Sequence, residues 1–295
     1  MPSERRVGVF FLITVVLAWG FTWPVNKLVL LSVAPIWSVA LRSVIAVVVL
    51  FAIAVATRRL VRPVRGDVPV LISVTVLHMV GFTVLTSLGL QVVPAGRSVV
   101  LAYTTPLWVT PAAALVLGER LGARSLLGVA IGLVGLALLF NPVAFDWSDR
   151  RVVLGNASIL AGALLWAGAI LHIRAHRWRV STFELLPWQM ALSTVLLVAI
   201  ALALEGVPSI EWTPSLAALL LYGGGPGTAL AYWASANAGR RLPAFTMSLG
   251  LLATPVVSVS IATVWLREPL TLTLVSAIVL ILGGIAIGTL APARR

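Results

Sequence analysis

His78 and Arg42 are side chains that can carry charge and that lie well inside long apolar stretches, away from their ends. Ionisable groups are expensive to bury in hydrocarbon, so they usually face a cavity or a polar partner. His78 can hydrogen-bond a bound solute, or titrate near neutral pH. The alternative is an interhelical hydrogen bond. We predict that His78 faces a cavity.

Arg42 follows Pro35 by seven residues, about 10 Å along a helix at 1.5 Å per residue. Insertion scales give about 2.5–3.5 kcal/mol for an arginine at mid-membrane. Arg42 therefore either meets a substrate carboxylate or caps carbonyl groups of a neighbouring helix. We treat it as an intramembrane charge and favour the structural role.

Aromatic residues within the apolar stretches give the best indication of a substrate. Rings suit an apolar pocket that has a few polar groups, although tryptophan also collects at membrane interfaces. Trp19, Tyr103 and Trp166 are the deepest of these rings. The predicted substrate-binding residues are Trp19, His78, Tyr103, Trp108, Trp166, Trp188, Gly225, Tyr232 and Ser248.

None of the nine acidic residues is predicted near the middle of an apolar stretch. A proton-coupled exporter of cationic drugs typically needs such a carboxylate, so the cargo is expected to be neutral, zwitterionic or anionic. Without cysteine, thiolate chemistry and cysteine metal sites are excluded. Neither H-E-x-x-H nor G-x-S-x-G occurs, and Ser87 lies roughly 13 Å of helix rise from His78. We therefore expect no enzyme activity, metal or cofactor.

The composition indicates a membrane protein. Of 295 residues, 60% are hydrophobic and 10% are charged, with a mean hydropathy of +1.07. The net charge of +12 comes mainly from short loops, where basic residues set membrane orientation. The expected partners are therefore the lipid bilayer and a small molecule, and no nucleic acid.

Ten stretches approach the roughly 20 apolar residues of a membrane-spanning helix. They are 7–30, 35–57, 68–90, 95–117, 123–140, 152–174, 183–204, 214–237, 242–265 and 271–290. If the N-terminus is cytoplasmic, 15 basic residues lie inside and 5 outside, with Arg42 left in a helix. This bias predicts a multi-pass protein of the inner (plasma) membrane with both termini cytoplasmic.

The chain is an internal duplication. A shift of 149 residues aligns Pro94 with Pro243, Pro106 with Pro255 and Glu119 with Glu268. We predict a first repeat over 1–140, a linker over 141–151 and a second repeat over 152–295. Five helices per repeat is an odd number, so the repeats are inverted, as in alternating-access transporters.

Prolines and glycines mark the expected hinges. Pro106 and Pro255 fall near mid-helix, where proline removes a backbone hydrogen bond. Gly223, Gly224, Gly225, Pro226 and Gly227 fall within one apolar stretch and disfavour helix there. The alternative for each is a static kink or close helix packing. Because the first half has no matching glycine run, the two halves are expected to differ.

The repeats resemble the EamA family of the drug/metabolite transporter superfamily. The resemblance rests on Pro-Ala at 94–95 and 243–244, the mid-helix prolines, Glu119 and Glu268, and covers almost the whole chain. It implies an all-α transporter of ten transmembrane helices in two inverted five-helix repeats, functional as a monomer. The aromatic amino-acid exporters of the YddG type are the suspected relatives. Export of amino acids is the expected activity, with nucleotide-sugar or drug-like cargo as the alternative.

Overall fold

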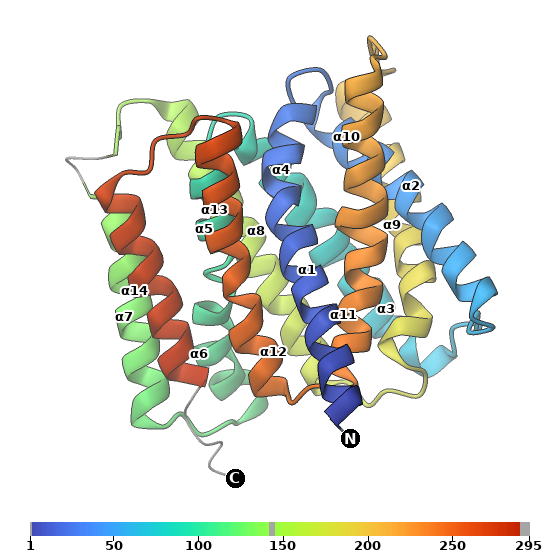
Figure 1. Cartoon of the computed structure of the whole chain (residues 1–295), viewed down its shortest axis with the longest axis horizontal. Helices are drawn as coiled ribbons and strands as arrows, with labels where there is room; N and C mark the ends of the chain where they lie inside the picture. The colour runs from blue at the N-terminus through green and yellow to red at the C-terminus, as the bar shows by residue number, and fades with distance from the viewer. Residues whose placement is uncertain (1, 142–144, 290–295) are drawn as a thin grey trace.

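The structure, a computed structural model, describes residues 2–141 and 145–289, and these residues form helices and loops with no strand. Figure 1 shows the helices running mostly side by side across one bundle. Part of the predicted linker (142–144) and the C-terminal residues 290–295 lie outside the described residues. The elements are α1 (Pro2–Val29), α2 (Pro35–Ala56), η1 (Arg65–Asp67), α3 (Val68–Ser73), η2 (Val74–Phe82), α4 (Thr83–Leu90), α5 (Ala95–Ala102), α6 (Thr105–Leu117), α7 (Ala123–Leu139), α8 (Arg150–Ala175), α9 (Thr182–Glu205), α10 (Pro214–Gly224), η3 (Gly225–Leu230), α11 (Ala231–Gly239), α12 (Ala244–Leu251), α13 (Ala253–Trp265) and α14 (Leu272–Thr289).

Helix occupies every predicted apolar stretch. Eight helical stretches of the described chain are long and apolar enough to cross a membrane. Helix α7 is apolar but has only 17 residues, and the stretch from α10 to α11 is interrupted by η3. The protein is therefore an all-helical, multi-pass membrane protein.

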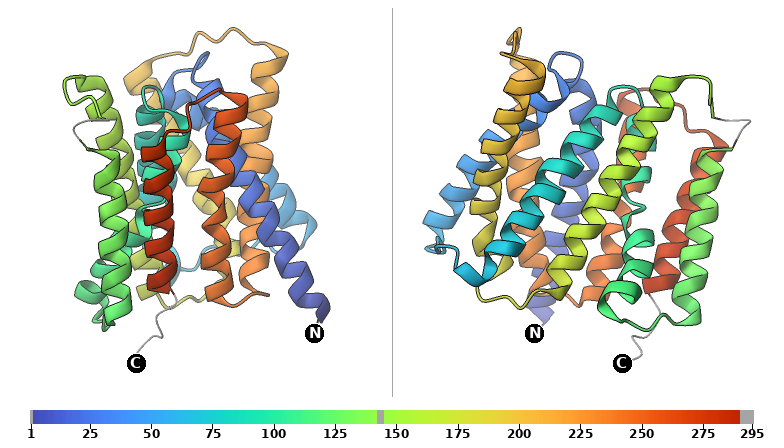
Figure 2. Two further views of the ribbon diagram at one scale, coloured as in Figure 1. Left: turned by 60° about the vertical axis from the view of Figure 1, so that its left-hand side comes forward. Right: turned by 180° about the vertical axis from the view of Figure 1, so that it is seen from behind.

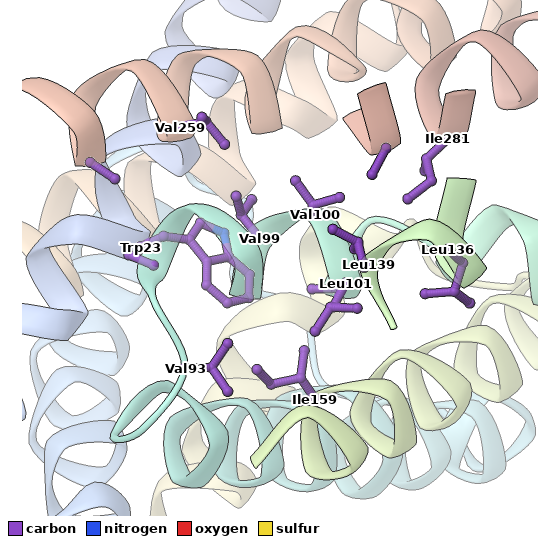
Figure 3. Packing of buried hydrophobic residues seen from close by; sticks show 14 of the residues in the cluster. Trp23, Val93, Val99, Val100, Leu101, Leu136, Leu139, Ile159, Val259 and Ile281 are labelled. Atoms are coloured by element: carbon purple, nitrogen blue, oxygen red, sulfur yellow. The ribbon is translucent and has the colours of Figure 1, made fainter. Parts of the chain in front are cut away.

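Helix α5 belongs to a hydrophobic core cluster, and its side chains are almost entirely buried. Val99 and Leu101 are fully covered and pack against Val259 of α13, Ile281 of α14 and Ile159 of α8 (Figure 3). Helices α2 and α9 pack together at one edge of the bundle, and α7 and α14 at the other (Figures 1 and 2). Segments far apart in the sequence thus enclose one common interior.

Glycines set the contact between α7 and α14. A Cβ atom added at Gly128 would overlap the carbonyl oxygen of Gly284, and one added at Gly284 would overlap that of Gly128. Backbone in contact with backbone requires glycine on both helices. The small residues of these two helices therefore pack against each other within one chain.

Carboxylates cap helix N-termini in other parts of the chain. The two oxygens of Glu205 accept the backbone N–H groups of Ile36 and Trp37, each at 2.9 Å, at the start of α2. Buried Asp67 accepts Val180 N–H at 2.8 Å and pairs with His176 Nε2 at 2.8 Å, just before α9 begins. The negative charges meet the positive ends of the helix dipoles. These contacts join residues of the first half of the chain to residues of the second half.

The fourth apolar stretch is broken just before Pro106. Helix α5 ends at Ala102 and α6 begins at Thr105, so the break lies about a turn before the position that the proline suggested. Proline cannot donate to the carbonyl four residues earlier, here that of Ala102. The Thr105 hydroxyl donates to this oxygen at 2.8 Å instead. The ninth stretch breaks at Leu252, between α12 and α13, which is the position equivalent to Tyr103.

The third and eighth stretches both contain π-helix. Element η2 covers residues 74–82 and η3 covers residues 225–230, and a shift of 149 residues nearly superposes these ranges. The first half, which has no matching glycine run, therefore has a structural counterpart of the glycine-rich interruption. The same irregularity forms without a glycine run, because π-helix requires only i to i+5 hydrogen bonding. Such segments frequently mark functional sites.

Candidate functional site

A cavity of about 130 Å³ lies at the centre of the bundle, beside η2 and η3. Its lining comes from α1, α2, η2, α4, Tyr103, α8, α9, η3 and α11. The ninth apolar stretch, which contains the predicted substrate-binding residue Ser248, contributes no lining residue from α12 or α13. Helices α2 and α9 do contribute lining residues, because they pack directly against the π segments.

Aromatic rings form one connected wall of the cavity. The His78 ring stacks on Trp166, with centroids 5.1 Å apart and planes 6° apart, and meets Tyr232 at 6.2 Å. Tyr232 contacts Trp19 at 5.9 Å, and Trp166 contacts Tyr103 at 6.2 Å. The structure thus brings together five of the nine predicted substrate-binding residues, from both halves of the chain. Phe82, which the sequence analysis did not select, joins the same group at 5.0 Å from Trp166.

His78 belongs to η2 and points into this wall. Among the described residues it has ring contacts but no hydrogen bond. The alternative interpretation, an interhelical hydrogen bond, is therefore not supported by the described contacts. A neutral imidazole carries one donor and one acceptor nitrogen, and both remain available to a solute in the cavity.

The polar residues of the lining, which form its polar wall, include Arg42. The side-chain stem of Arg42 packs on Gly223, where an added Cβ atom would lie 3.1 Å from the arginine Cδ. Its guanidinium makes no hydrogen bond or ion pair with any residue that the structure describes. The structural role that the sequence favoured, capping of a neighbouring helix, is thus absent from the described contacts. Asn26 lines the cavity in the same region.

Serine and threonine hydroxyls complete the polar wall, and the sequence analysis selected none of them as substrate-binding residues. Many donate their proton to a backbone carbonyl, so their oxygen lone pairs remain to accept hydrogen bonds from a solute. Ser38 and Ser87 both donate to the carbonyl of Pro35, at 2.7 and 3.0 Å. Serine and threonine are common in packed membrane helices, so they gave no signal. The hydroxyl residues of the lining are Thr22, Ser38, Ser43, Thr83, Thr86, Ser87, Ser193 and Thr228.

Four predicted substrate-binding residues lie outside the central cavity. Trp108 donates its indole N–H to Thr104 and packs on the hydrophobic core. Trp188 donates to the carbonyl of Val61 and contacts Phe51. Gly225 lies in η3 but is absent from the lining, where Gly227 and Thr228 stand instead. Residue spacing alone does not say which face of a helix meets the cavity.

The fourth of these residues, Ser248, is exposed and borders a second hollow of about 790 Å³. This hollow lies between α6, α7, α12 and the end of α14, at the end of the bundle where α1 begins and α14 ends (Figure 1). Pro106 and Glu119 also line it. The second hollow therefore opens at this end of the bundle, beside α6 of the fourth apolar stretch and α12 of the ninth.

Nine carboxylates lie outside both the ring wall and the polar wall. None of the acidic residues is among those that line the central cavity. Glu268 caps α5, and Glu119 pairs with Arg174. Within the described residues there is also no group of three or more potential metal ligands. The cavity therefore offers one cation, many acceptor oxygens and stacked rings.

Comparisons of the chain with a family model and with known proteins agree that it is similar to transporters. The model of the EamA-like transporter family matches residues 6–141 and again residues 153–290. The uncharacterized transporter YoaV of Bacillus subtilis (strain 168) is 26% identical over 284 residues, which is 96% of this chain and 97% of YoaV. The uncharacterized transporter YvbV of the same organism is 24% identical over 292 residues, 97% of this chain and 92% of YvbV. One solved crystal structure, 24% identical, shares the fold with a TM-score of 0.68 over 98% of this chain and 97% of that one.

Proposed function

Since the chain belongs to the EamA-like transporter family, we propose that it exports small, largely apolar metabolites, above all amino acids including aromatic ones, by alternating access. The main support for this proposal is the composition of the central cavity. Its stacked rings suit an apolar or aromatic body, and its hydroxyl oxygens and Arg42 suit the polar groups of an amino acid. The chain performs no chemical conversion and needs no cofactor.

A nucleotide-sugar cargo fits this cavity less well. Phosphate groups need several cationic partners, and Arg42 is the one Lys or Arg among the lining residues that the structure describes. A cationic drug fits less well too, because no carboxylate lines the cavity. A small amphiphile with at most one negative group remains the best match.

The proposed arrangement has ten membrane segments in two inverted repeats, 1–140 and 152–295, with the linker outside and both termini in the cytoplasm of an inner-membrane protein. The 149-residue correspondence of the helix breaks at Tyr103 and Leu252, and of η2 and η3, supports it. One protomer contains a complete cavity, so we propose a functional monomer.

The proposed hinges lie beside these irregularities. Pro106 and Pro255 follow the two breaks, and Gly223, Gly224, Pro226 and Gly227 surround the start of η3. Helices that already lack regular hydrogen bonds at these points can bend there with little further loss. Bending would open the cavity to one side and then to the other.

Uptake into proteoliposomes tests the function. Flux of radiolabelled Phe, Trp, Met, Thr, Asp and Lys is measured with and without a pH gradient. We expect selective flux of Phe, Trp and Met. Accumulation that requires the gradient and is lost in His78→Ala would assign proton coupling to His78. Equal flux without a gradient would make the protein a facilitator with His78 as a substrate contact. Absence of flux for all six would contradict the amino-acid assignment.

The native chain contains no cysteine, so single cysteines test the topology directly. Ser148→Cys lies in the predicted linker, on the outer side. A membrane-impermeant thiol reagent should label it in intact cells, whereas labelling only after lysis would contradict the proposed orientation.

A further inference from the structure

The guanidinium of Arg42 is a buried cation without a partner. It lines the central cavity, and no carboxylate, hydroxyl or carbonyl of the described residues pairs with it. Such a charge is unfavourable unless water or a ligand completes its hydrogen bonds. Helix capping, the usual structural explanation, is not among its contacts.

Arg97 shows what a structural arginine of this chain looks like. Its Nε donates to Asn156 Oδ1 at 2.7 Å and its Nη2 donates to the Leu139 carbonyl at 2.7 Å. Its guanidinium also lies over the Phe140 and Phe145 rings, at 5.2 and 4.8 Å. Arg97 is thus satisfied by protein groups in a region that is largely apolar, whereas Arg42 is not.

We propose that Arg42 binds the carboxylate of the transported substrate, whose apolar body lies against the wall of stacked rings. The guanidinium fork matches a carboxylate with two parallel hydrogen bonds. Asn26, beside Gly223 in the same region, offers a further amide, and Tyr232 connects this region to the rings. The inference rests on the proposed transport function and names the chemical group that the site recognises.

Three related probes separate the polar groups of an amino acid. L-Phenylalanine has both a carboxylate and an amine, 3-phenylpropanoate lacks the amine, and L-phenylalaninamide lacks the carboxylate. Ligand-induced thermal stabilisation of the purified protein reports binding without transport. The first two should stabilise the wild type and the amide should not. Arg42→Gln should weaken binding of the two carboxylates by at least about 10-fold, the loss typical of deleting a charge-assisted hydrogen bond.

The ligand-free melting temperature supplies an independent measurement. Arg42→Gln should leave it unchanged or raise it, because an unpaired buried charge disappears. The matched variant Arg97→Gln should lower it and leave carboxylate recognition intact. A lower melting temperature in Arg42→Gln, or amide binding as strong as that of phenylalanine, would overturn the proposal while leaving transport of neutral amphiphiles possible. If neither L-phenylalanine nor 3-phenylpropanoate binds, the proposal that the substrate carries a carboxylate is overturned. The proteoliposome flux measurements then test the transport function separately.

A second, independent observation concerns two glutamates that the 149-residue shift relates. Glu268 binds the N-terminus of α5, where its two oxygens accept Ala95 N–H at 2.6 Å and Gly96 N–H at 2.8 Å. Its equivalent, Glu119, is paired with Arg174 at 2.6 Å and its side chain is 42% exposed. The second hollow lies beside Glu119, between α6 and α12. At one end of the bundle, Glu268 caps α5 and the end is closed. At the other end, Glu119 makes no such cap on α12, and the second hollow is open there.

We infer that Glu119 and Glu268 form alternating caps on α12 and α5. When the hollow closes, Glu119 exchanges Arg174 for the N-terminal N–H groups of α12, and Glu268 releases α5. The breaks at Tyr103 and Leu252 would absorb the movement. Among the described residues, three buried hydroxyls of these helices have no hydrogen-bond partner: Ser98 on α5, and Thr254 and Ser258 on α13. This inference rests on the inverted-repeat arrangement proposed above.

Opposite effects of two matched substitutions test it. Ser248→Cys borders the open hollow and reports its accessibility to a soluble thiol reagent. Glu268→Gln weakens the cap made in this state, so labelling should fall several-fold. Glu119→Gln weakens the cap of the other state, so labelling should stay high or rise.

Glu205→Gln is the control, because Glu205 caps α2 with the same two-bond geometry outside the broken stretches. It should lower thermal stability without changing labelling of Ser248→Cys. Equal labelling in Glu119→Gln and Glu268→Gln, or a change in the same direction, would overturn the alternating caps. Normal phenylalanine flux in both variants would overturn them as well, without affecting the assignment of the substrate.

Discussion

The imidazole of His78 lies face to face with the indole of Trp166, at a centroid distance of 5.1 Å and an angle of 6°. His78 belongs to a π segment in the first half of the chain, and Trp166 belongs to α8 in the second half. The contact therefore joins the two halves of the chain at the cavity wall. A movement of one half relative to the other must change this stack or carry it along.

Trp166 contacts three rings of the cavity wall, those of His78, Phe82 and Tyr103. Each aromatic pair is worth about 0.5–1.5 kcal/mol beyond buried area. Trp166→Ala should therefore weaken binding of phenylalanine by about 10-fold or more, and Trp166→Phe should weaken it less. Titration by thermal stabilisation measures both. Trp108→Ala serves as the control outside the cavity, and an equal loss of affinity there would contradict the assigned ring wall.

Gly128 should be intolerant of any side chain. Alanine there would place its Cβ against the backbone of Gly284 and Gly288, which cannot move aside as a flexible side chain does. Gly128→Ala should lower the melting temperature in detergent and force α7 and α14 apart. Gly283, one residue from the contact, has no atom within 4 Å of its added Cβ. Gly283→Ala should be neutral or stabilising by up to about 1 kcal/mol. If both variants melt alike, the glycine contact does not determine stability.

Alanine substitutions at Gly224 and Gly225 should distinguish a role of glycine in helix packing from a role in helix bending. A Cβ atom at Gly224 would lie 2.6 Å from the Arg42 carbonyl oxygen, whereas one at Gly225 meets nothing within 4 Å. Gly224→Ala should lower stability. Gly225→Ala should keep the fold but lower flux, because alanine restricts the backbone of η3 more than glycine does. Unchanged flux in Gly225→Ala would show that this residue is no hinge.

Lys27 should stabilise the end of the third apolar stretch. Its ammonium donates to the carbonyl oxygens of Leu90, Gln91 and Val93, at 2.6, 3.1 and 3.1 Å. A cation at a helix C-terminus also favours the helix dipole. Lys27→Met should cost about 1.5–3 kcal/mol, the range for hydrogen bonds to a charged group. Thermal unfolding in detergent measures the loss, and Arg62→Met, at an exposed loop position, should not reproduce it.

The helical stretches and the deeply placed aromatic rings could be predicted well from the sequence. Apolar length alone placed the helices, and the intramembrane positions of Trp19, His78 and Trp166 pointed to the cavity. Trp108 and Trp188 have the same side chain as Trp166 but turn to other neighbours, which only tertiary packing decides. The π segment η2 has no glycine or proline signal before Gly81, so residue types did not reveal it. The partner of Glu268 lies 173 residues away and was equally invisible.

The π segment η2 also determines how the two ends of its stretch are turned relative to each other. Adjacent residues of an α-helix differ by about 100° in direction and 1.5 Å in height. Removing a single residue from η2 would rotate α4 by that angle, so that exposed Leu88 moved toward the interior and Ser87 moved away. The number of residues in η2 therefore determines which side chains of α4 face the cavity. The π segment has this effect although it precedes the residues that it orients.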